Sequence, residues 1–288
     1  MATKKKMKDG PGTGGGEIIA CTPKFLPRTK WAQAAQAATK VNPMNRPAVE
    51  HLGLVSRSAA PTQAFLAVLT TKFWGSKGVK LTVGFLDNPP ADFRQRILAH
   101  MNAWDKTGNV RFTAASTDPQ VRIARVPGDG YWSYLGTDIL QIKKDQPTMN
   151  LDSFTMQTPE AEYRRVVRHE TGHTLGFPHE HMRRSLVALI DRDKAFRHFG
   201  DGQGWDKNMV IQQVLTPLEE SSLLATDNPD PDSIMCYQIP GSITKNGKTI
   251  AGGLDIDTSD FEFIGRIYPK PKSQVPKRGP RRKKRAKR

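Results

Sequence analysis

Alternation between apolar and polar positions is clearest at residues 79–85, Val-Lys-Leu-Thr-Val-Gly-Phe, and it predicts a half-buried β-strand. From Ala91 to Trp104 the apolar residues instead recur at helical spacing, which predicts an amphipathic helix with one face in the core. The glycine- and aromatic-rich segment Gly128–Thr137 is expected to form a loop. Shorter apolar runs predict further strands at Val110–Phe112, Val121–Val126, Ile139–Ile142 and Thr148–Phe154.

Boundary signals mark several more helices. Thr158 as N-cap and Pro159 as the first helical residue open a helix that Gly176 should end. Ser259 begins a capping box that opens a final helix toward Tyr268. The other helical patterns lie at Trp31–Val41, Thr62–Phe73, Arg192–Phe199 and Trp205–Leu215, the last two separated by a glycine-rich turn at 200–204.

The composition is that of a globular protein with basic ends. Hydrophobic residues make up 37% of the 288 residues, which is enough for a sizeable core. No apolar run has the length of a signal peptide or a membrane span, so we expect a soluble protein that is cytoplasmic or exported by a non-classical route. We divide the chain into a disordered leader at 1–16, an N-terminal extension at 17–75 that is a pro-segment or scaffold, a main folded domain at 76–269 and a disordered polybasic tail at 270–288.

The formal net charge of +16 is typical of a nucleic-acid-binding protein, but most of this charge lies at the two ends of the chain. The tail holds eleven Lys and Arg and no acid, and the leader holds four Lys against Asp9. These segments carry +11 and +3, which leaves about +2 for the folded part. The tail can therefore bind a polyanion, either nucleic acid or an anionic membrane surface, serve as a nuclear-type address, or only keep the chain soluble.

A metal-binding pattern, HExxHxxGxxH, begins at His169. On a helix, His169 and His173 project from one face and can bind the same ion. Glu170 stands outside this pair but close enough to take a proton from a water on the metal. Gly176 allows the positive φ of a tight turn, which returns His179 as a third ligand. Three neutral imidazoles leave a fourth position open, which is typical of a catalytic rather than a structural zinc site.

The same residues resemble those of the metzincin zinc endopeptidases. Because Glu180 directly follows the third histidine, the chain resembles the astacin branch most. A second motif supports the resemblance, because residues 233–237, Ser-Ile-Met-Cys-Tyr, have the Ser-x-Met-x-Tyr form of the methionine turn in astacins and serralysins. The resemblance implies that Met235 forms the apolar floor of the site. It also implies that Tyr237 binds the metal or hydrogen-bonds the oxyanion, unless it is a buried structural tyrosine. His181 is not needed by this geometry and is expected behind the ligands or facing solvent.

The resemblance covers roughly residues 76–269, and it implies an α+β, metzincin-like zincin fold for them. In that fold a twisted mixed sheet and the zinc helix form an upper subdomain, and an irregular or helical lower subdomain closes the cleft. It implies an endopeptidase with one Zn²⁺, in which Glu170 is the general base and a protein or peptide substrate lies extended along an edge strand. We expect a monomer. We expect that strand within Thr148–Phe154 and a specificity pocket near Gln238–Thr244.

The chain also departs from typical astacins, which are secreted, disulfide-bonded and activated by trimming. It has two cysteines, Cys21 and Cys236, and no evident trimming site, so we expect Glu180 to pair with Arg183, Arg184 or another cation. Cys21 could occupy the open metal position and keep the enzyme latent, form a bridge with Cys236, or be an ordinary buried cysteine. Another class of function stays open, a polyanion-binding protein that acts through its tail, with an inactive or secondary metal domain, as does an effector combining both.

Overall fold

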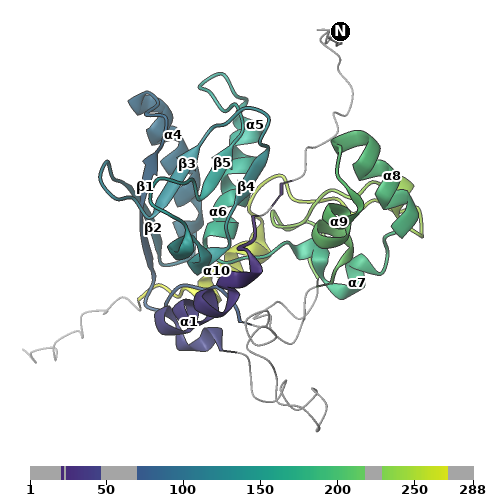
Figure 1. The fold of residues 1–288 in the computed structure, drawn as a ribbon, viewed down its shortest axis with the longest axis horizontal. Helices are drawn as coiled ribbons and strands as arrows, with labels where there is room; N and C mark the ends of the chain where they lie inside the picture. The colour runs from purple at the N-terminus through teal and green to yellow at the C-terminus, as the bar shows by residue number, and fades with distance from the viewer. Residues whose placement is uncertain (1–20, 23, 47–69, 218–228, 272–288) are drawn as a thin grey trace, which may run out of the picture.

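The computed structural model describes residues 21–22, 24–46, 70–217 and 229–271. Two lobes are visible in Figure 1, one built on a sheet and one built mainly of helices. The leader, residues 272–288 of the tail and most of the predicted helical turn at Thr62–Phe73 lie outside the described residues. No helix in the described part of the chain is long and apolar enough to cross a membrane.

A five-stranded sheet in the order β2-β1-β3-β5-β4 forms the first lobe. Strands β1, β2, β3 and β5 are parallel, and β4 runs antiparallel to β5 at one edge. The strands are β1 Val79–Phe85, β2 Val110–Ala114, β3 Val121–Ala124, β4 Tyr131–Ser133 and β5 Met149–Leu151. The predicted strands at 79–85, 110–112, 121–126 and 148–154 therefore all contain a strand.

Three predictions for this lobe are wrong. The expected loop at 128–137 contains the edge strand β4, and the expected strand at 139–142 is mostly a 3-10 helix, Gly136–Gln141. β5 lies between β3 and β4, so the segment 148–154 is not the edge along which a substrate could lie. The edge strand on this side of the sheet is β4.

The predicted helix at Ala91–Trp104 is confirmed as α4, Ala91–Met101, followed by a 3-10 helix at Asn102–Lys106. The zinc helix is continuous from α5, Glu160–Glu162, through a π-helical segment, Tyr163–Val167, to α6, Arg168–Thr174. It starts one residue later than expected, with Pro159 in the capping position. Thr158 instead closes a turn by accepting a hydrogen bond from the backbone of Thr155.

The second lobe follows the zinc helix. It consists of a 3-10 helix at Glu180–Met182, α7 at Arg184–Val187, α8 at Arg192–Gln203, and α9 at Lys207–Val210, which continues as a π-helical segment at Ile211–Leu215. The expected turn at 200–204 is wrong, because α8 continues to Gln203 and ends at Gly204 with a φ of 68°.

The C-terminal part of the described chain contains a 3-10 helix at Gly241–Ile243 and the final helix α10, Thr258–Ile267. The predicted capping box is displaced, since the reciprocal pair is Asp257 and Asp260 rather than Ser259 and Glu262. Aspartate is among the preferred N-cap residues, so a capping box is present as expected, but it begins two residues earlier than predicted.

The N-terminal extension packs on the sheet lobe (Figure 1). It contains a 3-10 helix at Arg28–Lys30, the predicted helix α1 at Trp31–Val41, and a 3-10 helix at Pro43–Asn45. Asn45 is 1% exposed, and its amide donates to the carbonyls of Ala38 and Phe73 while its oxygen accepts from the Phe73 amide. These buried hydrogen bonds fasten the extension to the segment that enters β1.

Each lobe has its own hydrophobic core. The first lies between the sheet, α4 and the zinc helix, and its largest buried members include Phe93, Trp104 and Tyr163. The second joins α7, α8 and α9 to the segment after the methionine turn. Met235 belongs to the first core and Tyr237 to the second, so the methionine turn lies where the two lobes meet.

Candidate metal centre

The two helical histidines lie on one face of α6, as their spacing predicts. His169 and His173 are 8% and 1% exposed, and their ring centroids are 4.8 Å apart. Gly172, between them, packs against the sulfur of Met235, where a Cβ would approach to 2.4 Å. A small residue at this position therefore lets the helix lie directly on the methionine turn, and Met235 lies under the site as the resemblance implied.

Gly176 ends the helix with a φ of 99°, a conformation that glycine adopts without strain. The redirected chain brings His179 back to the helical pair. Its Nε2 lies 3.1 Å from Nε2 of His169 and 3.0 Å from Nε2 of His173. The structure therefore gathers all three predicted ligands around one point.

Hydrogen bonds on the outer side of two rings prepare them to bind a cation. His169 Nδ1 lies 2.6 Å from the carbonyl of Ile234, and His173 Nδ1 lies 2.8 Å from that of Phe177. A carbonyl accepts, so both Nδ1 atoms carry hydrogen and both Nε2 lone pairs point inward. Burial lowers the pKa of His169 to about 4 and lowers the pKa of His173 and His179 well below the usual value. All three are therefore neutral imidazoles near pH 7.

Glu170 faces the same cavity and is fully buried. Neither carboxylate oxygen has a hydrogen-bond partner among the described residues. Burial raises the pKa of this carboxyl to about 8. The neighbouring Cys21 thiol opposes this shift. A buried carboxyl next to three converging imidazoles is typical of a proton acceptor in a catalytic metal site.

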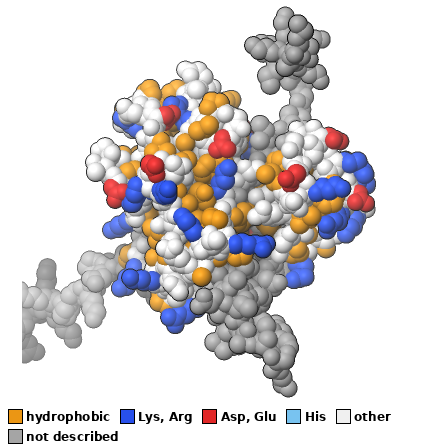
Figure 2. Space-filling view, viewed as in Figure 1, with side chains coloured by type: hydrophobic (Ala, Val, Ile, Leu, Met, Phe, Trp, Pro, Cys, Tyr) orange, Lys and Arg blue, Asp and Glu red, His pale blue; other side chains and the backbone are white. Residues whose placement is uncertain are grey.

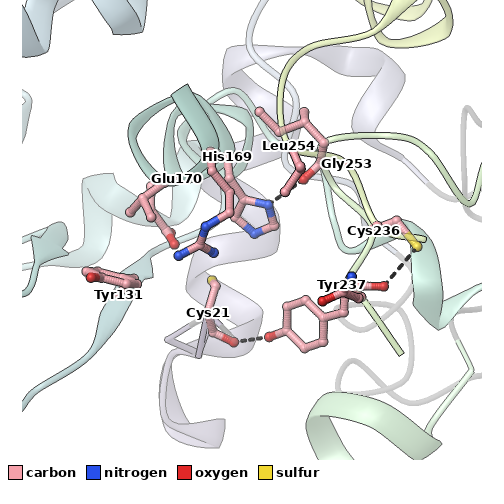
Figure 3. A pocket seen from close by; sticks show the side chains of 13 residues that line it. Cys21, Tyr131, His169, Glu170, Cys236, Tyr237, Gly253 and Leu254 are labelled. Carbon is pink, nitrogen blue, oxygen red and sulfur yellow. Dashed lines mark hydrogen bonds between the residues drawn. The ribbon is translucent and has the colours of Figure 1, made fainter. Parts of the chain in front are cut away.

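Cys21 of the N-terminal extension completes the cluster. One potential ligand atom from each of Cys21, His169, His173 and His179 lies within 4.8 Å of the others. Figure 3 shows the Cys21 side chain directed to the site, below His169 and Glu170. Burial, followed by the charge of Glu170, raises the pKa of the thiol well above its usual value. Both cysteines are free thiols, so the proposed bridge between Cys21 and Cys236 is wrong.

The residues next to Cys21 lie along the edge strand β4. The Thr22 amide donates to the carbonyl of Tyr131 at 2.9 Å, and Lys24 forms a parallel bridge with Tyr134. The Cys21 carbonyl accepts a hydrogen bond from the hydroxyl of Tyr237, as Figure 3 shows. The extension therefore contacts the sheet edge, the histidine cluster and the tyrosine of the methionine turn together.

Tyr237 is 6% exposed, and its ring lies 4.3 Å from that of His179. His181 is fully buried and stacks on it, with centroids 4.0 Å apart and an interplanar angle of 18°. His181 Nε2 faces the carbonyl of Gln213 at 2.9 Å, and Nδ1 accepts from the Tyr237 amide at 3.4 Å. His181 therefore lies behind the cluster, one of its two expected positions, and holds the plane of the tyrosine ring.

Glu180 pairs with Arg183 at 3.4 Å, the first of the cations expected for it, and also accepts from the Asp230 amide. Burial raises the pKa of Glu180 to about 7; the hydrogen bond from the Asp230 amide and the charge of Arg183 oppose that shift, and the charge of Asp230 adds to it. Its bonds therefore connect the turn after the third histidine to the segment before the methionine turn.

The donor set fits zinc. Zn²⁺ is bound by imidazole nitrogen and thiolate sulfur in four-coordinate sites, and three histidines with one cysteine supply that number and chemistry. With Cys21 displaced, the three histidines leave a position for water, as in catalytic zinc sites.

Comparison with known proteins agrees with this geometry. The family model described as astacin, a family of peptidases, matches residues 68–252, which is well over half of the chain. The chain belongs to the astacin family. This confirms the predicted family, and zinc is the metal that astacin-family metalloproteases use.

Individual relatives of this astacin-family chain cover different parts of it. The zinc metalloproteinase nas-27 of Caenorhabditis elegans is 35% identical over 107 residues, which are 37% of this chain and 23% of that proteinase. The chain thus spans less than a quarter of that relative. A structure of myroilysin is 28% identical with a TM-score of 0.65 and covers 70% of this chain and 97% of its own. A crystal structure of myroilysin is 29% identical with a TM-score of 0.53, covering 69% and 86%. These likenesses confirm the zincin fold class.

Several residues that line the cavity of this astacin-family site were missed from the sequence. Tyr131 was missed because it falls in the segment that was predicted as a loop. Leu254 was missed because it is a 61% exposed apolar residue with no periodic pattern around it. Arg165 could have been found, because it precedes His169 by one helical turn and so lies on the same face. The predicted pocket segment 238–244 contributes Gln238 to the lining.

Proposed function

We propose that this chain is a zinc-dependent endopeptidase that hydrolyses peptide bonds. The observation that carries the proposal is the convergence of three neutral, buried imidazole nitrogens beside the buried carboxyl group of Glu170. Bound zinc supplies Lewis-acid activation of water and of the scissile carbonyl. A purely structural zinc site has no use for a base at this position.

The proton chemistry is assigned to Glu170. Its carboxylate would take a proton from the attacking water and return it to the leaving amine, since it faces the same cavity as His169. Tyr237 is proposed as a hydrogen-bond donor to the developing oxyanion, because its hydroxyl already donates to a carbonyl oxygen, that of Cys21.

The substrate is a protein or peptide held in extended form, and we propose β4 as the strand it pairs with. β4 is an edge strand, and residues of the extension already form a backbone hydrogen bond and a bridge with Tyr131 and Tyr134. An edge that accepts one extended segment offers the same donors and acceptors to another.

The chain as described is proposed to be latent. The Cys21 thiol lies within 4.8 Å of the ligand atoms of the three histidines, its carbonyl accepts the hydrogen bond of the Tyr237 hydroxyl, and the Thr22 amide donates to the edge strand β4. Three groups that a substrate needs are thus taken by one segment. Of the alternatives open at the start, control by Cys21 is the one these contacts support.

The polyanion-binding alternative depends on the tail, of which residues 272–288 lie outside the described part of the chain. On the face drawn in Figure 2, acidic and basic side chains are interspersed rather than gathered by sign. No contact of the described residues favours this second function, and it stays a prediction from the sequence.

The test is cleavage of unfolded casein by the Cys21→Ser chain, with zinc content measured on the same preparation. Cleavage should stop with a chelator and return with added zinc. His179→Ala should lose the metal, because two ligands on one helix rarely hold zinc tightly, whereas His198→Ala, a histidine of α8 away from the cluster, should keep it. Cleavage that survives chelation, or stoichiometric zinc in His179→Ala, would contradict the proposal.

A further inference from the structure

A buried carboxylate of the final helix is bonded to the methionine turn. Asp260, in the first turn of α10, accepts hydrogen bonds from Ser233 Oγ at 2.6 Å and from the Ile234 amide at 2.9 Å. Asp260 and Ser233 are 7% and 4% exposed. Ser233 and Asp260 are 27 positions apart in the sequence. The carboxylate therefore fixes the turn from below.

The same turn reaches the first histidine of the cluster. Ser233 Oγ accepts from the Met235 amide at 3.0 Å, and this amide shares its peptide group with the carbonyl of Ile234. That carbonyl lies 2.6 Å from His169 Nδ1. Each link has a donor and an acceptor: His169 donates to the peptide oxygen, the peptide amide donates to Ser233, and Ser233 donates to Asp260. Hydrogen bonds joined in this way polarise one another in the same direction.

We propose that Asp260 and Ser233 are positioning residues for the metal ligand His169, joined to it through the Ile234–Met235 peptide. The chain of bonds fixes the hydrogen on Nδ1 and makes Nε2 a stronger electron donor to the metal. The inference deepens the proposed function, because it rests on His169 being a zinc ligand.

Helix capping alone does not explain the arrangement. The reciprocal cap needs only the bonds between Asp257 and Asp260, at 2.8 and 3.2 Å, which can form at the surface. Burial raises the pKa of Asp260 to about 6, so placing an ionised carboxylate there costs free energy that the cap does not require. The bonds to Ser233 and the Ile234 amide oppose this cost, and they are the bonds that lead to His169.

The three histidines differ at Nδ1. His173 Nδ1 lies against a carbonyl of its own turn, that of Phe177. His179 Nδ1 has no hydrogen-bond partner among the described residues. Among the hydrogen bonds described, those of His169 are the ones that lead on to a carboxylate, that of Asp260.

The decisive experiment is the zinc dissociation constant of full-length Ser233→Ala, measured at pH 7.5 with reductant by competition with a chromogenic chelator. This variant removes one link and leaves the bonds of Asp260 to Ile234 and Asp257 in place. We expect zinc to bind about tenfold more weakly. Ser233→Thr, which restores a hydroxyl, should recover most of the affinity. Asp260→Asn should lose more, and the double variant should lose no more than Asp260→Asn, because both residues act in one chain of bonds.

Ser259→Ala is the matched control. Its hydroxyl bonds Asp257 and Asp230 at the same helix start but lies outside the proposed chain. Its zinc affinity should stay within about twofold of wild type, whatever happens to the unfolding temperature of the metal-free protein. A Ser233→Ala dissociation constant within about twofold of wild type, or an equal loss in Ser259→Ala, overturns the inference. Zinc affinity is measured without substrate, so this inference and the proposed peptidase activity can fail separately.

Discussion

At the scale of single residues, the site depends on polar groups whose ordinary behaviour is changed by burial. Tyr237 is an example, since burial raises its pKa well above the usual value and keeps its hydroxyl protonated as a donor. The ring is held by the stack with His181, so the hydroxyl is positioned before any substrate arrives. A preorganised donor of this kind acts mainly on the transition state.

Tyr237→Phe should therefore lower kcat by about 100-fold with little change in zinc content. The comparison is made in chains that also carry Cys21→Ser, because the same hydroxyl holds the Cys21 carbonyl and its loss would loosen the extension. Steady-state kinetics on a short peptide and zinc analysis are the measurements. Unchanged turnover would leave Tyr237 as a structural tyrosine of the second core.

A second residue-scale prediction concerns stability. Burial lowers the pKa of His100, and although Glu160 opposes the shift, Arg168 and Arg96 add to it. The folded state thus favours the neutral ring, so its contribution is fully present above the unfolded pKa of about 6.5 and is lost as the pH falls toward the folded pKa. The drop in unfolding temperature between pH 7.5 and 5.5 should be smaller in His100→Phe than in wild type. An equal drop would show that His100 does not titrate on unfolding in this range.

At the scale of elements, the conformation at the end of the zinc helix determines whether His179 reaches the other two histidines. A Cβ on Gly176 would lie 3.0 Å from the Lys72 carbonyl, and the φ of 99° disfavours any other residue. The helix end is thus fitted against the segment that leads into β1. The position of His179 depends on this fit.

Gly176→Ala should lower the free energy of unfolding by about 1–3 kcal/mol and also weaken zinc binding, because the strained turn displaces His179. Gly204→Ala is the control, since it shares a positive φ of 68° but has no atom within 4 Å of the added Cβ. It should lose stability and keep its zinc affinity. Denaturant unfolding with chelator present and a zinc titration measure the two effects, and an unchanged zinc affinity in Gly176→Ala would refute the link.

The sequence predicted the elements that are long enough to show several repeats of their apolar pattern. β1, α1, α4 and the zinc helix each span several repeats of their pattern, and the histidine motif is local to one helix and its turn. β4 was missed because three residues, Tyr131–Ser133, cannot show an alternation. The bonds from Asp260 to Ser233 were equally invisible, since they join segments that only the tertiary fold brings together.

At the scale of the whole molecule, one extended segment lies across the site between the two lobes. Its residues contact β4 on the sheet lobe and Tyr237 of the second core, to which Cys21 also belongs, while α1 packs the following part against the sheet lobe. Release of the segment would therefore remove one small side chain, that of Cys21, from the second core and leave the first core unchanged. This is the arrangement expected of a removable inhibitor rather than of fixed scaffold.

Cys21→Ser should raise casein cleavage, on the order of tenfold, because the substrate no longer competes with a tethered thiol. The effect should persist in reductant, since both cysteines are free. Cys236→Ser, which removes the other buried thiol, should give no such rise. If Cys21→Ser is no more active than wild type with and without reductant, control by Cys21 fails and the extension is scaffold.

The central claim, that Glu170 is the base of a zinc peptidase, is tested most directly by Glu170→Ala placed on the Cys21→Ser chain. Zinc content and the rate of casein cleavage are measured on one preparation. The account predicts one zinc per chain and a rate lower by about 10²–10⁴-fold, because the three imidazoles remain while the proton acceptor is gone. A zinc-loaded variant that still cleaves within about tenfold of its parent would contradict it.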